Sequence, residues 1–291
     1  MSDPTPLSAA EAVRLAREAL EGGEPMASVT VIEARAAEGG AACPPPGARM
    51  AVWRDRTRGT LGDPALDRAA AAFARETLAA GGRAATREVE AGGAAATLYA
   101  EPHQAPPELV IVGAGHIARP LCRVGALLGF RVTVLDDRPE FATRERFPEA
   151  AEVRRADFSE PLLGVPMGRG THLVLVTRGH KYDYEALRDV LRRPELPAYL
   201  GMVGSRRRTR AALEQLARDG TDPARIAAVR APVGLDLHAE TPEEIAVAIA
   251  AELVLLRRGG SGRPLRETER VFERWVERRG ELPRNSAAPG T

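Results

Sequence analysis

A glycine-rich turn is the part of the sequence whose residue types point most directly to chemistry. The apolar run 109–112 leads into Gly113-x-Gly115-x-x-Ala118. Gly113 permits a tight turn, Gly115 lets the backbone approach a phosphate group, and Ala118 lets a helix pack closely against a strand. The unpaired amide groups at the start of that helix would attract the same phosphate. This spacing predicts a dinucleotide-binding turn between a strand and a helix.

An acidic pair follows the next apolar run at the distance typical of ribose recognition. Residues 131–135 form that run, and Asp136 and Asp137 follow it, about 20 residues after the glycines. We expect Asp136 to accept hydrogen bonds from ribose hydroxyl groups, a pattern that favours NAD over NADP. A Rossmann-like fold without a bound nucleotide stays open at this point, because a fold does not determine its ligand.

Further polar residues fall where other predicted strands end. His116, beside the predicted phosphate position, would donate to a phosphate or a substrate oxygen, or would simply cap the helix. Arg178 and His180 follow a buried strand and would hold an anion or transfer a proton, or would form an ordinary capping turn. Ligands of open α/β sheets bind outside the carboxyl ends of the strands, so these groups are expected to converge.

A run of arginines opens a later predicted helix. Ser205 is its expected N-cap and a candidate phosphate ligand. Arg206 and Arg207 would bind a second phosphate or a carboxylate through paired hydrogen bonds, and the alternative is a solvated helix start. The acids and histidine that alternate through residues 236–240 are a poor metal cage, so no metal site is predicted.

Hydrophobic periodicity predicts an α/β protein with two folded parts. From residue 108 onward strands alternate with helices, which predicts a Rossmann-like, doubly wound parallel sheet. A small α+β domain precedes it, and the proline-rich stretch 101–107 separates the two. We expect domains at residues 1–105 and 108–258, followed by a C-terminal helix and a disordered tail at 259–291. The predicted strands of the second domain are 109–112, 132–135, 152–154, 172–177, 199–203 and 228–230, and its helices are 117–128, 184–192, 206–218 and 241–256.

Composition limits the class of protein. The 291 residues carry a formal net charge of +1, so no basic field predicts nucleic-acid binding. The two cysteines are too few for a disulfide framework or a multi-cysteine zinc site, which favours a reducing cytoplasmic location. We expect Cys122 in the core and Cys43 exposed and inert. No signal peptide is visible, and the longest apolar segment, 245–256, is too short to span a membrane.

Five ordered segments of the second domain resemble the XdhC/CoxI family, the accessory proteins of xanthine dehydrogenase and carbon monoxide dehydrogenase. These segments are residues 109–118, 134–139, 176–180, 199–207 and 231–245. The resemblance implies a chaperone-like maturation factor without turnover of its own. Such proteins bind the molybdenum cofactor, as molybdopterin or its dinucleotide form, protect it while its terminal sulfido ligand is installed, and insert it into an apo-enzyme. The implied partners are a molybdenum hydroxylase subunit of the xanthine dehydrogenase type and, as a further candidate, a cofactor sulfurase. A homodimer is expected.

The first domain resembles the family less closely and is expected to be a divergent CoxI-like domain. Its loop at residues 40–50 lacks the hydroxyl residues and first arginine that the family carries there, and residues 59–67 lack the family's triple glycine and cysteine. Cofactor binding is therefore expected in the second domain, unless the protein has an altered task. The expected cofactor-binding residues are Gly113, Gly115, His116, Ala118, Asp136, Asp137, Arg178, His180, Ser205, Arg206 and Arg207.

Two other functions stay open. An NAD-dependent oxidoreductase is compatible with the glycine turn and Asp136, with His180 and Asp183 as the candidate acid or base above the nicotinamide. The third hypothesis is a scaffold with a vestigial pocket, whose task is to dock one subunit of a dehydrogenase.

Overall fold

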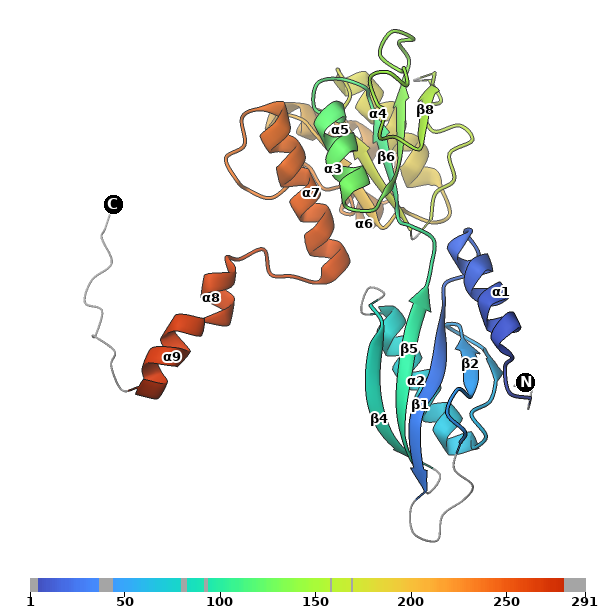
Figure 1. Ribbon diagram of the computed structural model, residues 1–291. Helices are drawn as coiled ribbons and strands as arrows, with labels where there is room; N and C mark the ends of the chain where they lie inside the picture. Colours follow the sequence, from blue (N-terminus) through green and yellow to red (C-terminus); the bar gives the residue numbers. More distant parts are fainter. Residues whose placement is uncertain are drawn as a thin grey trace.

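Two separate five-stranded sheets organise the molecule, one antiparallel and one parallel (Figure 1). The computed structural model describes residues 5–36, 44–79, 83–91, 94–157, 159–168 and 170–279. The first sheet ends at residue 103 and the second begins at residue 108, so the chain passes from one to the other in four residues. The predicted fold class, a small α+β unit followed by a Rossmann-like parallel sheet, is confirmed.

The antiparallel sheet has the strand order β3-β2-β1-β5-β4, with a helix on each face. Its elements are α1 (Ala9–Leu20), β1 (Met26–Ala36), β2 (Arg49–Val52), β3 (Thr57–Gly59), α2 (Pro64–Ala79), β4 (Ala85–Ala91) and β5 (Ala94–His103). Side chains alternate along a strand, so Val29 and Val31 of β1 pack under α2 while Met26 packs under α1. Ser8 and Glu11 form a capping box that starts α1.

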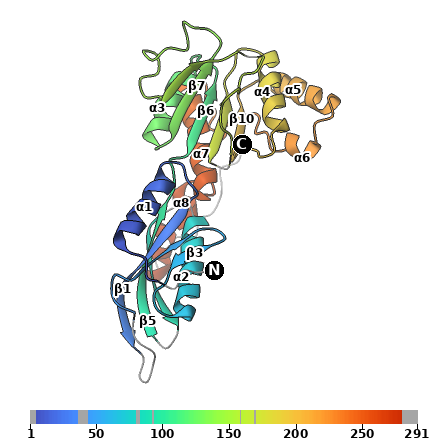
Figure 2. The ribbon, with the colours of Figure 1, turned by 90° about the vertical axis from the view of Figure 1, so that its right-hand side faces the viewer.

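The parallel sheet has the strand order β10-β9-β6-β7-β8 and helices on both faces, as Figure 2 shows. Its elements are β6 (Glu108–Val112), α3 (Ala118–Leu127), β7 (Arg131–Asp136), β8 (Glu152–Arg155), β9 (Thr171–Leu175), α4 (His180–Arg192), β10 (Tyr199–Met202), α5 (Arg206–Arg218), α6 (Pro223–Ile226) and α7 (Pro242–Arg258). Leu109 and Ile111 of β6 pack against α3 and α7, whereas Val110 and Val112 pack against α4 and α5. Burial on both faces explains why the strands are continuous apolar runs.

The strand order fixes where a ligand crevice is expected. The chain moves from β6 outward through β7 to β8, then crosses to the other side of β6 to form β9 and β10. The direction therefore reverses between β6 and β9, whose carboxyl ends carry the glycine turn and residues 176–180. Crevices at such switch points are where open α/β sheets bind ligands.

The structure differs from the sequence prediction at several elements. The strand predicted at 228–230 is reduced to one parallel bridge between Gly201 and Arg230, and Pro232 has no N–H to extend the ladder. The predicted C-terminal helix is two helices, α8 (Leu265–Glu269) and α9 (Val271–Arg279), because Arg270 adopts a left-handed conformation with φ +47°. Strand β5 extends into the predicted linker as far as His103. The three-residue β3 and four-residue α6 are too short to show a periodicity.

Candidate functional site

The two glycines of the turn have different structural roles. Gly113 has φ +107°, and a Cβ atom there would lie 2.7 Å from the carbonyl oxygen of Val176, so only glycine fits. A Cβ atom on Gly115 would meet no atom within 4 Å. The protein itself therefore does not require glycine at position 115, and the open space beside it is available to a ligand.

Helix α3 begins beside that open space without a side-chain cap. Its N-cap residue, Ile117, makes no side-chain hydrogen bond to the first turn, and no acidic residue lies in that turn. Ala118 is fully buried, as close packing of α3 requires, and His116 is exposed next to the helix start. The first amide groups of α3 and its positive dipole end are thus oriented as for anion binding.

Asp136 is placed beneath the turn and is 1% exposed. Its Oδ2 accepts a hydrogen bond from the Ala114 amide at 2.6 Å, and both carboxylate oxygens accept from the Arg138 side chain, at 2.8 and 2.9 Å. Burial would raise the pKa of Asp136, but the hydrogen bonds from Arg138 and Ala114 lower it to about 2. The carboxylate therefore positions the glycine turn and does not face solvent as a ribose acceptor would.

The neighbouring acid, Asp137, takes part in an ion pair that crosses the switch point. Arg178 donates from Nη1 and Nη2 to the two oxygens of Asp137 at 3.0 and 2.7 Å, and also from Nη2 to the Tyr182 hydroxyl at 2.7 Å. Hydrogen bonding to Asp137 raises the pKa of Arg178. Asp137 follows β7 and Arg178 follows β9, which flank β6, so the pair spans the carboxyl end of β6.

The arginine run at the start of α5 divides into exposed and buried members. Ser205 is the N-cap and accepts a hydrogen bond from the Arg208 amide, as predicted. Arg206 and Arg207 are exposed, and their side chains form no hydrogen bond or ion pair with another described residue. Arg208 points inward and donates from Nε to Asp183 Oδ2 at 2.6 Å. Arg206 and Arg207 are therefore available to a ligand, whereas Arg208 is not.

Asp183 and His180 were the candidate acid or base of the oxidoreductase hypothesis. Asp183 is fully buried and accepts hydrogen bonds from Arg208 and from the Thr177 hydroxyl, at 2.6 Å each. This carboxylate joins α4, α5 and the segment after β9, and it is not exposed to a substrate. His180 begins α4, but the placement of its side chain lies outside the described part of the structure.

Two arginines after β7, Arg138 and Arg146, also lie beside the glycine turn, and Arg146 was not expected there from the sequence. The Arg138 and Arg146 guanidinium groups lie 3.6 and 4.6 Å from the ring centre of Phe141. Arg146 Nη2 also donates to the Ala114 carbonyl at 3.3 Å. Arg138 lies two residues after the end of β7, which was an available signal, whereas Arg146 lies ten residues after that strand and its spacing gives no signal. With these two residues, six arginines and three aspartates gather at this edge, which favours an anionic ligand.

Other candidates lie elsewhere. Cys122 is buried in α3, and burial raises the pKa of its thiol to about 11, so it is not a thiolate at neutral pH. Cys43 lies outside the described residues. Asp236 and His238 are exposed, and the described part of the chain contains no cluster of three potential metal ligands. Within the same ranges, no helix is long and apolar enough to cross a bilayer.

The fold is a small antiparallel α+β domain followed by a Rossmann-type parallel sheet, whose carboxyl edge carries these arginine and aspartate side chains. One family model, described as the XdhC Rossmann domain, matches residues 109–253, and a second, described as the XdhC and CoxI family, matches residues 10–90. The chain belongs to the XdhC and CoxI family. The second match covers most of the antiparallel domain, up to residue 90, despite the altered segments at residues 40–50 and 59–67.

Two curated relatives each match part of the chain. It is 34% identical over 170 residues to the uncharacterized protein YqeB of Escherichia coli K12, which covers 58% of this chain and 31% of that protein. It is also 34% identical over 152 residues to a probable xanthine dehydrogenase subunit from Bacillus subtilis 168, covering 52% and 43%. The chain thus spans less than half the length of these relatives. A crystal structure described as a xanthine dehydrogenase from Bacillus halodurans is 20% identical, with a TM-score of 0.48, and covers 85% of this chain and 96% of that one.

Proposed function

We propose that this protein is a maturation factor that binds the molybdenum cofactor as cargo and delivers it to a molybdenum hydroxylase of the xanthine dehydrogenase type. Membership of the XdhC and CoxI family supports the class. The observation that supports the assignment is the presence, along the carboxyl edge of one parallel sheet, of the open space at Gly115, the uncapped start of α3 after β6, and the exposed Arg206 and Arg207 after β10. All three favour a phosphate-bearing molecule.

The site residues fall into two groups: a floor, which would lie under the bound cargo, and a mouth, which would lie at the opening of the site. Gly113 and Asp136 form the floor, because one permits the turn and the other fixes its Ala114 amide. The cargo's phosphate would lie on the start of α3 beside Gly115, with His116 as a neighbouring donor. The Asp137–Arg178 ion pair would lie at the mouth and exchange partners with the ribose or pterin edge, and Ser205 to Arg207 would contact a second anionic group.

The described residues fit the organic part of this cargo better than its metal. Guanidinium groups and helix amides recognise phosphate and planar polar rings. Cys122 is a buried thiol and offers no sulfur ligand to molybdenum. We therefore assign binding to the phosphate and pterin groups, and retention rather than turnover, because Asp183 is sequestered by Arg208.

A binding experiment tests this function against the alternatives. The purified protein is titrated separately with molybdenum cofactor and with NAD, under anaerobic and reducing conditions, and heats are recorded. Binding of the pterin without NAD supports the proposal. Binding of NAD alone favours an oxidoreductase, and binding of neither, with tight association to an apo-dehydrogenase, favours a docking scaffold. Homodimerisation stays a prediction for sedimentation of the same samples, and contact with a sulfurase stays a prediction for sedimentation after that enzyme is added.

A further inference from the structure

The C-terminal arm, residues 259–279, extends away from both folded parts of the molecule (Figure 1). Its helices are α8 and α9, and neither contributes a residue to the apolar core clusters of the described chain. The match to the XdhC Rossmann domain ends at residue 253, so the arm also lies outside that match. The arm is therefore a helical extension that the two cores do not use.

One side of the arm exposes large apolar side chains. Leu265 is 75% exposed, Val271 is 70% exposed, Phe272 is 65% exposed and Trp275 is 45% exposed. Phe272 and Trp275 are three residues apart in α9, which places them on one face, and their ring centres are 6.1 Å apart. Val276, beside them, is buried. A group of exposed apolar residues on a helix that is otherwise charged marks an interaction surface.

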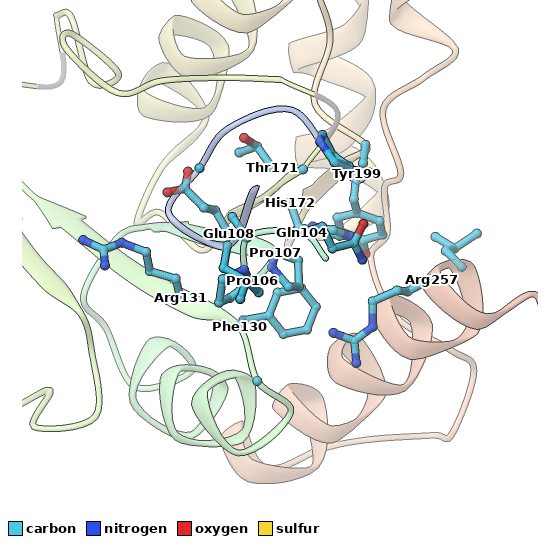
Figure 3. A pocket seen from close by; sticks show the side chains of 18 of the residues that line it. Gln104, Pro106, Pro107, Glu108, Phe130, Arg131, Thr171, His172, Tyr199 and Arg257 are labelled. Carbon is cyan, nitrogen blue, oxygen red and sulfur yellow. The ribbon is translucent and has the colours of Figure 1, made fainter. Parts of the chain in front are cut away.

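A cavity of matching size, the amino-edge cavity, lies between the two folded parts (Figure 3). Its volume is about 1360 Å³, and it is bordered by the loop 20–25, the amino ends of β6, β7, β9 and β10, and the end of α7. Apolar side chains that border it and stay exposed come from both parts, and they include Leu20, Pro106 and Leu256. A nine-residue helix such as α9 is about 13 Å long and 10–12 Å wide, so it occupies roughly 1100–1500 Å³. The cavity therefore has room for one helix of the arm.

Charge at the cavity also suits the arm. Arg131 and Arg257 border the cavity, and neither forms an ion pair within the described ranges, although Glu21 and Glu108 lie on the same rim. The Arg257 guanidinium donates only to a backbone carbonyl, at 3.3 and 3.4 Å. In α8, Glu269 is exposed, and it forms no ion pair with a described residue. Unmatched cations on one surface and an unmatched acid on the other are complementary.

The joint between α7 and the arm directs the arm outward. Gly259 ends α7 with φ +71°, and the Gly259 and Gly260 amides donate to the Leu255 carbonyl at 2.8 and 3.2 Å. A Cβ atom on Gly262 would lie 3.5 Å from the Leu255 side chain, so the joint folds against the end of α7. This course leads the arm away from the cavity of its own chain, as Figure 1 shows. A second copy of the chain offers the same cavity to the outward-pointing arm.

We propose that the arm of each chain docks into the amino-edge cavity of a second copy, so that two copies exchange arms in a symmetric dimer. The exposed apolar surface of one arm is about 400 Å², because an aromatic side chain alone offers about 150–250 Å². Two reciprocal contacts, counted on both chains, bury roughly 1600 Å², the size of a specific interface. The proposal does not rest on the proposed function, because the cavity and the glycine turn lie at opposite ends of the strands.

Sedimentation of the full chain at increasing concentration tests this interface. We expect a monomer–dimer equilibrium with a micromolar dissociation constant. Phe272→Gln alters the arm and Leu20→Gln alters the cavity, and each should weaken the dimer about a hundredfold, since a loss of about tenfold occurs at both contacts. Leu163→Gln is the matched control, because this side chain is 71% exposed and borders neither surface, and it should have no effect. Thermal unfolding checks that each variant folds.

Mixing the two variants distinguishes exchange of arms from pairing of the arms with each other. A mixed dimer retains one intact contact, in which the unaltered arm of Leu20→Gln docks into the unaltered cavity of Phe272→Gln. The other contact already lacks Phe272, so it loses little more from Leu20→Gln. We therefore expect the mixed dimer to be about tenfold tighter than either variant alone. Native mass spectrometry separates the mixed dimer by its mass.

Three results would overturn the proposal. The first is a wild-type chain that stays monomeric at every concentration tested. The second is a dimer whose dissociation constant is unchanged in both variants. The third is a loss of the dimer in Phe272→Gln but not in Leu20→Gln, because the arms would then pair with each other and not with the cavity.

Discussion

Replacing Asp136 with asparagine tests whether this residue stabilises the fold around the site or binds a ligand. The buried carboxylate accepts hydrogen bonds from Ala114 and Arg138, and its pKa is lowered from 3.8 to about 2. Since one pKa unit corresponds to about 1.4 kcal/mol, the ionised group contributes about 2 kcal/mol to the free energy of unfolding at pH 7. We expect Asp136→Asn to lower the free energy of unfolding at pH 7 by roughly that amount.

The size of this loss depends on pH in a known direction. Because the pKa of Asp136 is lower in the folded than in the unfolded protein, its stabilisation is present above pH 3.8 and is lost as pH falls towards 2. The difference in free energy of unfolding between wild type and Asp136→Asn is therefore about 2 kcal/mol at pH 7 and about 1 kcal/mol at pH 3.

Urea unfolding at the two pH values measures this difference. Hydrogen exchange of peptides covering residues 109–118 reports on the parallel-sheet domain separately, since a chain with two cores need not unfold in one transition. If Asp136→Asn had wild-type stability at pH 7 and lost affinity only for ribose-bearing ligands, Asp136 would be a ligand acceptor and the reasoning would be refuted.

Three further predictions concern the same edge of the sheet. Gly113→Ala should lower the free energy of unfolding by about 2–4 kcal/mol, because residue 113 has a positive φ and its Cβ atom would clash with Val176. Gly115→Ala should change the free energy of unfolding by less than about 1 kcal/mol. Equal losses for the two variants in urea unfolding would contradict this. The double variant Arg206→Gln with Arg207→Gln should leave the midpoint of urea unfolding unchanged and should weaken pterin binding more at low than at high salt. A loss of affinity that does not depend on salt would argue against direct charge contact. Arg208→Met should lower the free energy of unfolding by about 3 kcal/mol, because it leaves the buried carboxylate of Asp183 without its cation, and a loss no larger than that of the surface control Arg218→Met would disprove that role.

Much of the fold was predictable because its signals are local. The glycine turn, the apolar runs and the capping residues Ser8, Ser205 and Thr241 each act within a few neighbours, and the corresponding helices and strands are present. The departures have non-local or subtle causes. The split between α8 and α9 depends on the backbone conformation of Arg270, and the end of β5 depends on pairing with β1 along residues far away in sequence.

The site was predictable in position but not in pairing. The order of strands brings residues 113–118, 136–138, 176–180 and 205–208 to one edge, as parallel strands require. The sequence does not show which of the two acids is buried, because Asp136 and Asp137 are adjacent and their side chains point in opposite directions from the backbone. The orientation of Arg138 toward Asp136, and of Arg178 toward Asp137, is set by packing of separate elements and leaves no mark in spacing.

The most direct test of the central claim is molybdenum cofactor binding by Gly115→Leu, compared with wild type and with Gly170→Leu. Neither glycine has a neighbour within 4 Å of its Cβ position or a positive φ, so both variants should fold, which thermal unfolding checks. Bound pterin is quantified after anaerobic gel filtration of each protein with cofactor. The account predicts that Gly115→Leu retains no cofactor while Gly170→Leu retains as much as wild type. Wild-type retention by Gly115→Leu would contradict it, because the cofactor would then bind away from the glycine turn.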